Sequence, residues 1–119
     1  MGVNKKHHEF SVIDMSSGWE TLPGYPEGIQ QKILSGALDE ANKRGSRTRL
    51  LRFAPGAFTT KQVAHEYWEE VYIVSGDFTI RGKLLPPNSY TCQPPGVRHG
   101  PFKSNGGCLL FEVHYFDPV

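Results

Sequence analysis

The chain has 119 residues, enough for one domain with a buried core and too few for two. Its formal net charge of +1, with 21% charged residues, argues against a nucleic-acid-binding surface, and no apolar run approaches the about 18 residues of a membrane-spanning helix. Residues 1–10 are basic but no apolar segment follows them, which argues against a secretory signal. Two cysteines are too few for a disulfide framework, so we expect a reduced, cytoplasmic protein with no nucleic-acid or membrane partner.

Turn-forming residues are frequent along the whole chain. Thirteen Gly and nine Pro stand as single residues and short pairs, which is typical of a small all-β domain with many turns. The strands are predicted, in chain order, at residues 10–13, 29–34, 47–53, 71–74, 78–81, 89–93, 99–102 and 108–116. Strands at this spacing, with turns between them, indicate a β-sandwich or β-barrel.

The domain organisation is simple. Residues 1–9 are predicted to be a flexible polar tail, and residues 10–119 a single domain. Residues 39–45 are charged, end in glycine and lie between two β-like segments. They predict a hairpin tip, and a helical turn over residues 37–43 is the alternative.

The arginines of the strand after this tip differ in their expected orientation. Arg49, Leu51 and Phe53 share one face, because side chains two apart in a strand point the same way. Arg52 lies on the other face, so one of these two arginines is expected to point toward the interior or its rim. Surface roles are expected for Arg52 and Arg98, and binding of a substrate carboxylate is the alternative.

Two histidine-containing patches carry the candidate chemistry. His65 and Glu69 stand four residues apart, and an apolar strand follows Glu69. His99 follows a Pro-Pro-Gly turn in a distant part of the chain. If the fold brings the patches together, two imidazoles and a carboxylate form a set that binds a first-row divalent metal and leaves positions open for substrate. The alternative is structural: hydrogen-bonded histidines, and a solvated pair formed by Glu69 and Glu70.

The first patch resembles the first sequence motif of the cupin superfamily of small β-barrels. His65 and Glu69 are separated by three residues, and Glu69 and Gly76 by six, as in the second half of that motif. The motif has a further histidine where this chain has Val63. Its opening glycine matches Gly56 only with a shift of one residue.

The second patch resembles the second cupin motif. Asn88, the turn at residues 94–96 and His99 have its spacing, with Asn88 in place of a glycine. This exchange is mild, because asparagine tolerates left-handed backbone better than most residues. The closing asparagine of the motif is replaced by Lys103, with Asn105 nearby.

The resemblance implies an all-β fold, a small cupin-type β-barrel with jelly-roll-like topology, the double-stranded β-helix. The family usually holds its metal with three histidines and one glutamate, of which this chain keeps His65, Glu69 and His99. Two outcomes follow from this set. In the first, the three residues bind a divalent metal, for which Fe²⁺ is the first expectation and Zn²⁺, Mn²⁺ and Ni²⁺ are the alternatives. In the second, no metal is bound, because Val63 replaces the fourth ligand.

The local amino-acid sequence around the motifs, at residues 67–72 and 99–102, is similar to that of one subgroup of cupins. This subgroup contains acetylacetone-cleaving and dihydroxyacetophenone dioxygenases and the cupin domains of certain anti-sigma factors. The resemblance implies a metal-dependent dioxygenase acting on a small diketone or aromatic hydroxyketone, and a homodimer. One alternative is a metal-free isomerase, dehydratase or lyase in which His65 is the general acid and base. Another is a small-molecule-binding or sensor protein without turnover.

Four more side chains have a predicted role near the site. Tyr67 is expected to be catalytic, as a hydrogen-bond donor to a carbonyl substrate or as a further metal ligand, and core packing is the alternative. Cys92 is expected to be a small buried hydrophobe. Glu112 and His114 share a face of the last strand. They are expected to form an outward, solvated pair; if that face is internal, they contact the substrate, or His114 completes the metal site.

Overall fold

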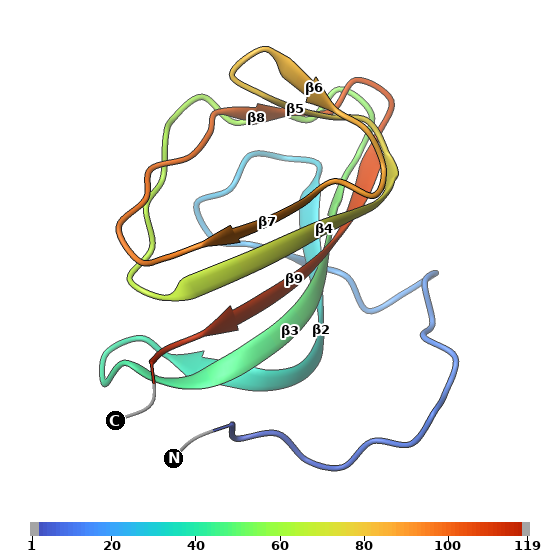
Figure 1. Cartoon of the computed structure of the whole chain (residues 1–119). Coiled ribbons are helices and arrows are strands. Elements are labelled where there is room, and N and C mark those ends of the chain that lie inside the picture. The colour runs from blue at the N-terminus through green and yellow to red at the C-terminus, as the bar shows by residue number, and fades with distance from the viewer. Residues whose placement is uncertain (1–2, 118–119) are drawn as a thin grey trace.

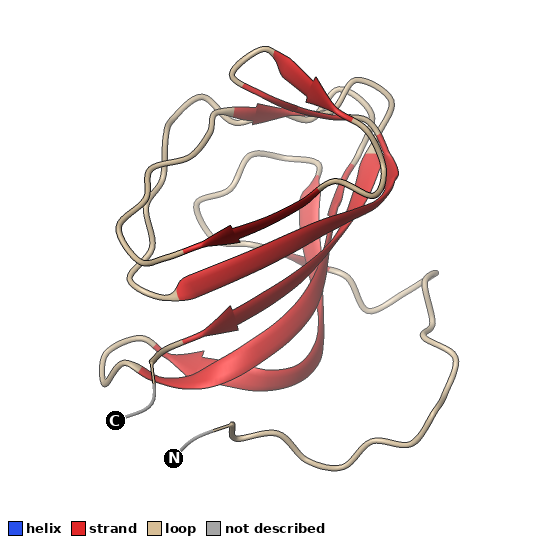
Figure 2. Ribbon diagram, in the orientation of Figure 1, coloured by secondary structure: helices blue, strands red, loops and turns tan. Residues whose placement is uncertain are grey.

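The computed structural model describes residues 3–117, which form two antiparallel β-sheets that face each other across a shared interior (Figures 1 and 2). The strands are β1 (Glu20–Thr21), β2 (Ile29–Asp39), β3 (Arg44–Phe53), β4 (Trp68–Gly76), β5 (Phe78–Ile80), β6 (Lys83–Leu85), β7 (Tyr90–Gln93), β8 (Phe102–Lys103) and β9 (Cys108–Tyr115). The described residues contain no helix, and hence none long and apolar enough to cross a membrane. The prediction of an all-β barrel is confirmed.

The order of the strands brings distant parts of the chain together. The large sheet has the order β1-β2-β3-β9-β4-β7, and the small sheet has the order β6-β5-β8. The last strand, β9, lies between β3 and β4 and pairs antiparallel with both (Figure 1). Side chains near the C-terminus therefore lie beside side chains from the middle of the chain.

The inward-facing residues of β9 change character along the strand. Cys108 and Leu110 are buried in the apolar core, and Glu112 and His114 follow on the same face and are buried too. This alternation gives the interior an apolar end and a polar end. Aromatic rings from both sheets pack in the apolar end. There the ring of Phe53 in β3 and the ring of Phe78 in β5 meet edge to face, with centroids 5.5 Å apart.

The predicted hairpin tip is confirmed. β2 ends at Asp39, residues 40–43 form the turn, and β3 begins at Arg44; the alternative of a helical turn is wrong. Both strands are longer than predicted, because each continues to pair with the other up to the turn. Their pairing is regular except for a register shift between Ile33 and Ser35.

Other strand predictions need correction. Residues 10–13 form no strand, because no neighbouring strand pairs with them and their apolar side chains are exposed. The strand predicted at residues 99–102 is reduced to β8, and His99 makes only an isolated bridge with a neighbouring loop. Two short strands, β1 and β6, lie in segments that were predicted as turns.

The N-terminal segment contacts the outside of the large sheet. The side-chain amide of Asn4 donates to the carbonyl oxygen of Ala37 at 2.8 Å, and Lys5 Nζ donates to Thr48 Oγ1 at 2.6 Å. These hydrogen bonds connect the start of the described chain to β2 and β3. The flexibility of residues 1–9 stays a prediction, and the first two of these residues lie outside the described part.

Candidate metal centre

One strand and two loops bring the three predicted ligands together. Glu69 is the second residue of β4 and faces inward, His65 lies in the loop before β4, and His99 lies in the loop between β7 and β8. One nitrogen or oxygen atom from each side chain lies within 4.8 Å of the other two. Glu69 Oε1 and His99 Nε2 are 3.6 Å apart, and both side chains are buried.

Backbone hydrogen bonds hold the two loops against each other. The N–H of His99 donates to the carbonyl of Val63 at 2.9 Å, and the N–H of Val63 donates to the carbonyl of His99 at 2.8 Å. The N–H of Gly96 donates to the carbonyl of His65, also at 2.8 Å. Each candidate histidine is thus attached to the loop that carries the other, so the main chain sets their separation.

The ring of His99 has the orientation expected of a metal ligand. Its Nδ1 is hydrogen-bonded to the side-chain oxygen Oε1 of Gln93. Because an amide oxygen only accepts, Nδ1 carries the hydrogen and Nε2 keeps its lone pair in the neutral ring. Metal-binding histidines commonly donate their second ring N–H to an acceptor of this kind.

His65 is also in the form that binds a metal. Burial lowers the pKa of His65 below its usual value of 6.5, against the opposing effect of the Glu69 carboxylate. The ring is therefore neutral near pH 7, as metal coordination requires. It stacks on the ring of Tyr67, with centroids 4.6 Å apart and planes inclined by 9°, and this stacking limits its rotation.

The three side chains fit a first-row divalent metal. Two atoms that each bind such a metal at about 2.1 Å lie about 3 to 4 Å apart, which agrees with the 3.6 Å between Glu69 Oε1 and His99 Nε2. Two neutral imidazoles and one carboxylate suit Fe²⁺, Zn²⁺, Mn²⁺ and Ni²⁺. Val63 lines the same cavity where the motif has its other histidine, and it supplies no donor atom.

A buried polar network lies beside Glu69, and the inward orientation of its residues was the alternative rather than the main expectation from the sequence. Glu112 and His114 face the interior and are 4% and 0% exposed, so the expected outward, solvated pair is wrong. The physical reason is the central position of β9, whose inner face is closed by the rest of the barrel. A signal was present in the sequence, because both residues stand at even spacing from the apolar Leu110.

An inward arginine balances one of the buried carboxylates. Arg49 is 4% exposed, which confirms the prediction of one interior arginine. Its Nη2 and Nε both lie 2.8 Å from Glu112 Oε1. Burial alone would raise the pKa of Glu112, but the charge of Arg49 and the hydrogen bond from His114 lower it to about 2. The pair is therefore ionised.

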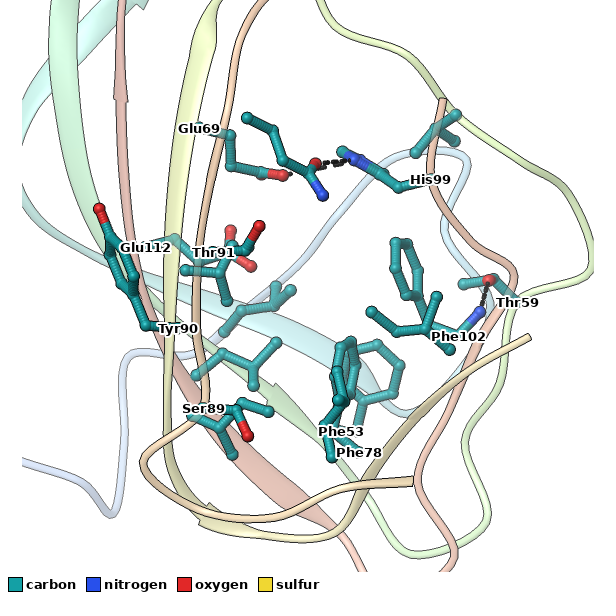
Figure 3. A pocket seen from close by; sticks show the side chains of 18 of the residues that line it. Phe53, Thr59, Glu69, Phe78, Ser89, Tyr90, Thr91, His99, Phe102 and Glu112 are labelled. Carbon is teal, nitrogen blue, oxygen red and sulfur yellow. Dashed lines mark hydrogen bonds and ion pairs between the residues drawn. The ribbon is translucent and has the colours of Figure 1, made fainter. Parts of the chain in front are cut away.

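The cluster of candidate ligands opens into a cavity of about 220 Å³ between the two sheets. Its apolar wall includes Leu51, Phe53, Ile73, Phe78, Phe102 and Leu110. Figure 3 shows Glu69 and His99 at one end of the cavity, and Phe53 and Phe78 at the other. Since a water needs only about 10–15 Å³ of such space, the cavity has room for a small organic ligand with a polar end and an apolar body.

Tyr67 is buried behind the histidines. Its ring packs against those of His65 and His114, and the residues that line the cavity do not include it. Burial and the neighbouring Glu69 raise the pKa of the Tyr67 phenol above its usual range, so the hydroxyl stays protonated. Its catalytic role stays a prediction.

Three other candidates lie away from the cavity. Cys92 is exposed, so its predicted burial is wrong: it stands two residues after Tyr90, on the outer face of β7. Arg52 lies on the outer face of the large sheet, where its Nη2 donates to Gln30 Oε1 at 2.7 Å. Arg98 is exposed. The surface positions expected for the two arginines agree with the structure.

Two facing antiparallel sheets that enclose a His/Glu/His cluster define a cupin. The sequence model of the ChrR cupin-like domain family matches residues 7–115, so the chain belongs to that family. No curated protein matches the chain.

Several solved structures share this fold. An RmlC-like cupin from Shewanella frigidimarina has a TM-score of 0.67 and 23% identity, covering 97% of this chain and 96% of the other. An acetylacetone dioxygenase from Acinetobacter johnsonii has a TM-score of 0.66 and 18% identity, covering 97% and 79%. A chain of the complex of Rhodobacter sphaeroides SigE with the anti-sigma ChrR has a TM-score of 0.63 and 21% identity, covering 87% and 51%. At these identities the likeness concerns the fold alone.

Proposed function

We propose that this protein is a metal-dependent cupin enzyme, a dioxygenase that acts on a small diketone or an aromatic hydroxyketone. The observation that carries the proposal is the cluster of His65, Glu69 and His99 at the polar end of a cavity whose other end is apolar. The three residues are proposed to hold the metal. The two histidines supply ring nitrogens, and Glu69 supplies a carboxylate oxygen.

The shape and polarity of the cavity support this substrate class. A diketone or hydroxyketone has two adjacent oxygen functions that chelate a metal, attached to an apolar body. The oxygens match the end with Glu69 and His99, and the body matches the aromatic wall formed by Phe53, Phe78 and Phe102 (Figure 3). Fold similarity to an acetylacetone dioxygenase agrees with this choice.

The residues of the chain have distinct parts in the proposed reaction. A divalent metal in the cluster supplies Lewis-acid polarisation of the substrate oxygens and, if it is Fe²⁺, activation of dioxygen. The apolar wall orients the substrate and excludes water, and Gln93 fixes the ring of His99. A carbon–carbon bond beside a carbonyl breaks and each fragment gains one oxygen atom, so dioxygen is the only oxidant and no reductant is consumed.

Metal analysis tests the proposal directly. Protein purified without chelators should contain about one divalent metal ion per chain, and His99→Ala should contain far less. His7→Ala is the matched control, because His7 is exposed in the N-terminal segment, and it should keep the wild-type metal content. With acetylacetone, the wild type should consume dioxygen and His99→Ala should not. Wild-type protein that holds no stoichiometric metal, and gains none on incubation with Fe²⁺, Zn²⁺, Mn²⁺ or Ni²⁺, rules the proposal out.

The same assays separate two other functions. The family match to the ChrR cupin-like domain favours, as a second candidate, a sensor that binds a small molecule without turnover. A sensor predicts a ligand that raises the melting temperature and is recovered unchanged after long incubation. A metal-free isomerase, dehydratase or lyase predicts activity that survives EDTA but is lost in His65→Ala. The homodimer and the cytoplasmic location stay predictions.

A further inference from the structure

Two buried histidines flank Glu69, and their rings have opposite hydrogen-bond environments. His99 Nδ1 faces an acceptor, the side-chain oxygen of Gln93. His114 Nδ1 faces only donors, the Nε and Nη2 of Arg47, at 3.0 and 2.7 Å. The two rings therefore carry their hydrogens on different nitrogens.

The tautomer of His114 follows from the chemistry of its neighbour. A guanidinium group has donors and no acceptor, so His114 Nδ1 must keep its lone pair and Nε2 must carry the hydrogen. His114 Nε2 lies 2.9 Å from Glu69 Oε2 and 3.3 Å from Glu112 Oε1. Both atoms accept, so the Nε2–H group is satisfied there and has no lone pair for a metal.

Because of this hydrogen bond, the two carboxylate oxygens of Glu69 face different histidines. Oε2 accepts from His114, whereas Oε1 lies toward His99, 3.6 Å from its Nε2. His114 is 0% exposed, and its ring is held on both nitrogens, so it has little freedom to turn. Arg49 Nε and Nη2 lie against Glu112 Oε1, so this neighbouring carboxylate is paired with an arginine.

We propose that Arg47 and His114 are positioning residues that hold Glu69 with Oε1 toward the metal and keep His114 from coordinating it. The inference rests on the proposed function, because it concerns the same site. It removes His114 from the candidate ligands and leaves the set of His65, Glu69 and His99 unchanged. The cluster of Glu69, Glu112 and His114, which has the residue types of a metal site, is accordingly a hydrogen-bonded support for Glu69.

Two substitutions at His114 separate positioning from coordination. His114→Gln keeps a donor for Glu69 and an acceptor for Arg47, whereas His114→Leu keeps neither. In titrations with Zn²⁺, His114→Leu should bind about 10–100-fold more weakly than wild type, and His114→Gln should stay within a few-fold of wild type. If His114→Gln binds as weakly as His99→Gln, His114 is a ligand and the inference is wrong. Equal affinity in wild type and in His114→Leu overturns it as well.

The tautomer has a readout that needs no metal. Long-range ¹H–¹⁵N NMR of metal-free wild type should show His114 with a bare Nδ1 and a protonated Nε2. In Arg47→Met the donors to Nδ1 are lost, so the other tautomer should become populated and the affinity for Zn²⁺ should fall. A protonated Nδ1 in wild type overturns the inference even if the metal site is present. Conversely, a wild type that binds no metal removes the proposed function and, with it, the role of positioning a ligand.

Discussion

Val63 stands beside His99 at the position where the cupin motif has its first histidine. Its backbone exchanges two hydrogen bonds with His99, and its side chain lines the cavity. A histidine at this position would lie next to the three existing candidate ligands without a change in the main chain. The site therefore lacks a donor atom rather than a suitable backbone.

Val63→His should raise the affinity for Zn²⁺ by about tenfold or more, because it adds an imidazole to an existing N/N/O set. The gain is measured by competition with a chelator of known affinity. Val63→Leu, which adds apolar volume but no donor, is the control and should show no gain. An unchanged affinity in Val63→His would mean that the side chain at this position points away from the metal.

Glu112 carries a buried negative charge that Arg49 compensates. Glu112→Gln should lower the free energy of unfolding by about 3–5 kcal/mol, because it leaves the Arg49 charge uncompensated in the interior. Urea unfolding measures this loss. Glu66→Gln is the control: Glu66 forms an exposed ion pair with Lys43 at 3.4 Å, and its removal should cost about 1 kcal/mol or less.

The difference in stability between wild type and Glu112→Gln depends on pH, and the direction of this dependence follows from the pKa of Glu112. The pKa of Glu112 falls from its usual 4.5 to about 2 in the folded protein, so the unfolded chain takes up the proton first as pH decreases. The stability due to this shift is fully present above about pH 4.5 and is lost as pH falls toward 2. The advantage of wild type over Glu112→Gln should shrink over the same interval. A constant advantage would show that Glu112 is not ionised in the native state.

At the scale of single elements, the end of β4 depends on a glycine. Gly76 has φ of 87°, and a Cβ atom there would lie 2.1 Å from the carbonyl oxygen of Gly107 in the facing strand connection. A register shift between Ile73 and Ser75 precedes it. The main chain therefore has no room for a side chain where β4 ends and the chain crosses toward β5.

Gly76→Ala should destabilise the fold by about 2 kcal/mol or more, because strained φ and a backbone clash act together. Gly82→Ala is the matched control. Gly82 also has a positive φ, 82°, but no atom lies within 4 Å of the added Cβ, so it should cost about 1–2 kcal/mol from the backbone alone. Thermal and urea unfolding compare the two variants. Equal losses would mean that the contact with Gly107 relaxes without cost.

Some strands and side-chain directions were predicted correctly from local sequence signals, and others were not. Strands bounded by glycine and proline were predicted because turn residues mark their ends locally. The strand predicted at residues 10–13 is wrong because a strand exists only with a partner, and pairing is not a local property. The meeting of His65, Glu69 and His99 was predicted because these residues match the spacing of the two cupin motifs. The inward direction of Glu112 and His114 was only the alternative expectation, because it depends on which strands cover β9.

At the scale of the whole molecule, metal binding and folding should be coupled. The candidate ligands come from two separate parts of the chain, so the complete set exists only in the folded protein. At a free metal concentration of about 100 times the Kd, binding should add about 2.7 kcal/mol of stability. For a domain of this size the melting temperature should rise by roughly 10 °C. His99→Ala should show no such rise, and a comparable rise in this variant would place the metal elsewhere.

The buried network has a consequence for the choice of compounds to screen. Arg49 and Glu112 form an ion pair in the cavity wall, and Glu69 adds a second carboxylate, so these three lining residues carry a formal charge of −1. A divalent cation added to this set leaves one net positive charge in a low-dielectric space, where uncompensated charge is costly. The ligand then has to act as the counter-ion. Enolates and other chelating anions with an apolar body should be screened before neutral molecules of the same shape.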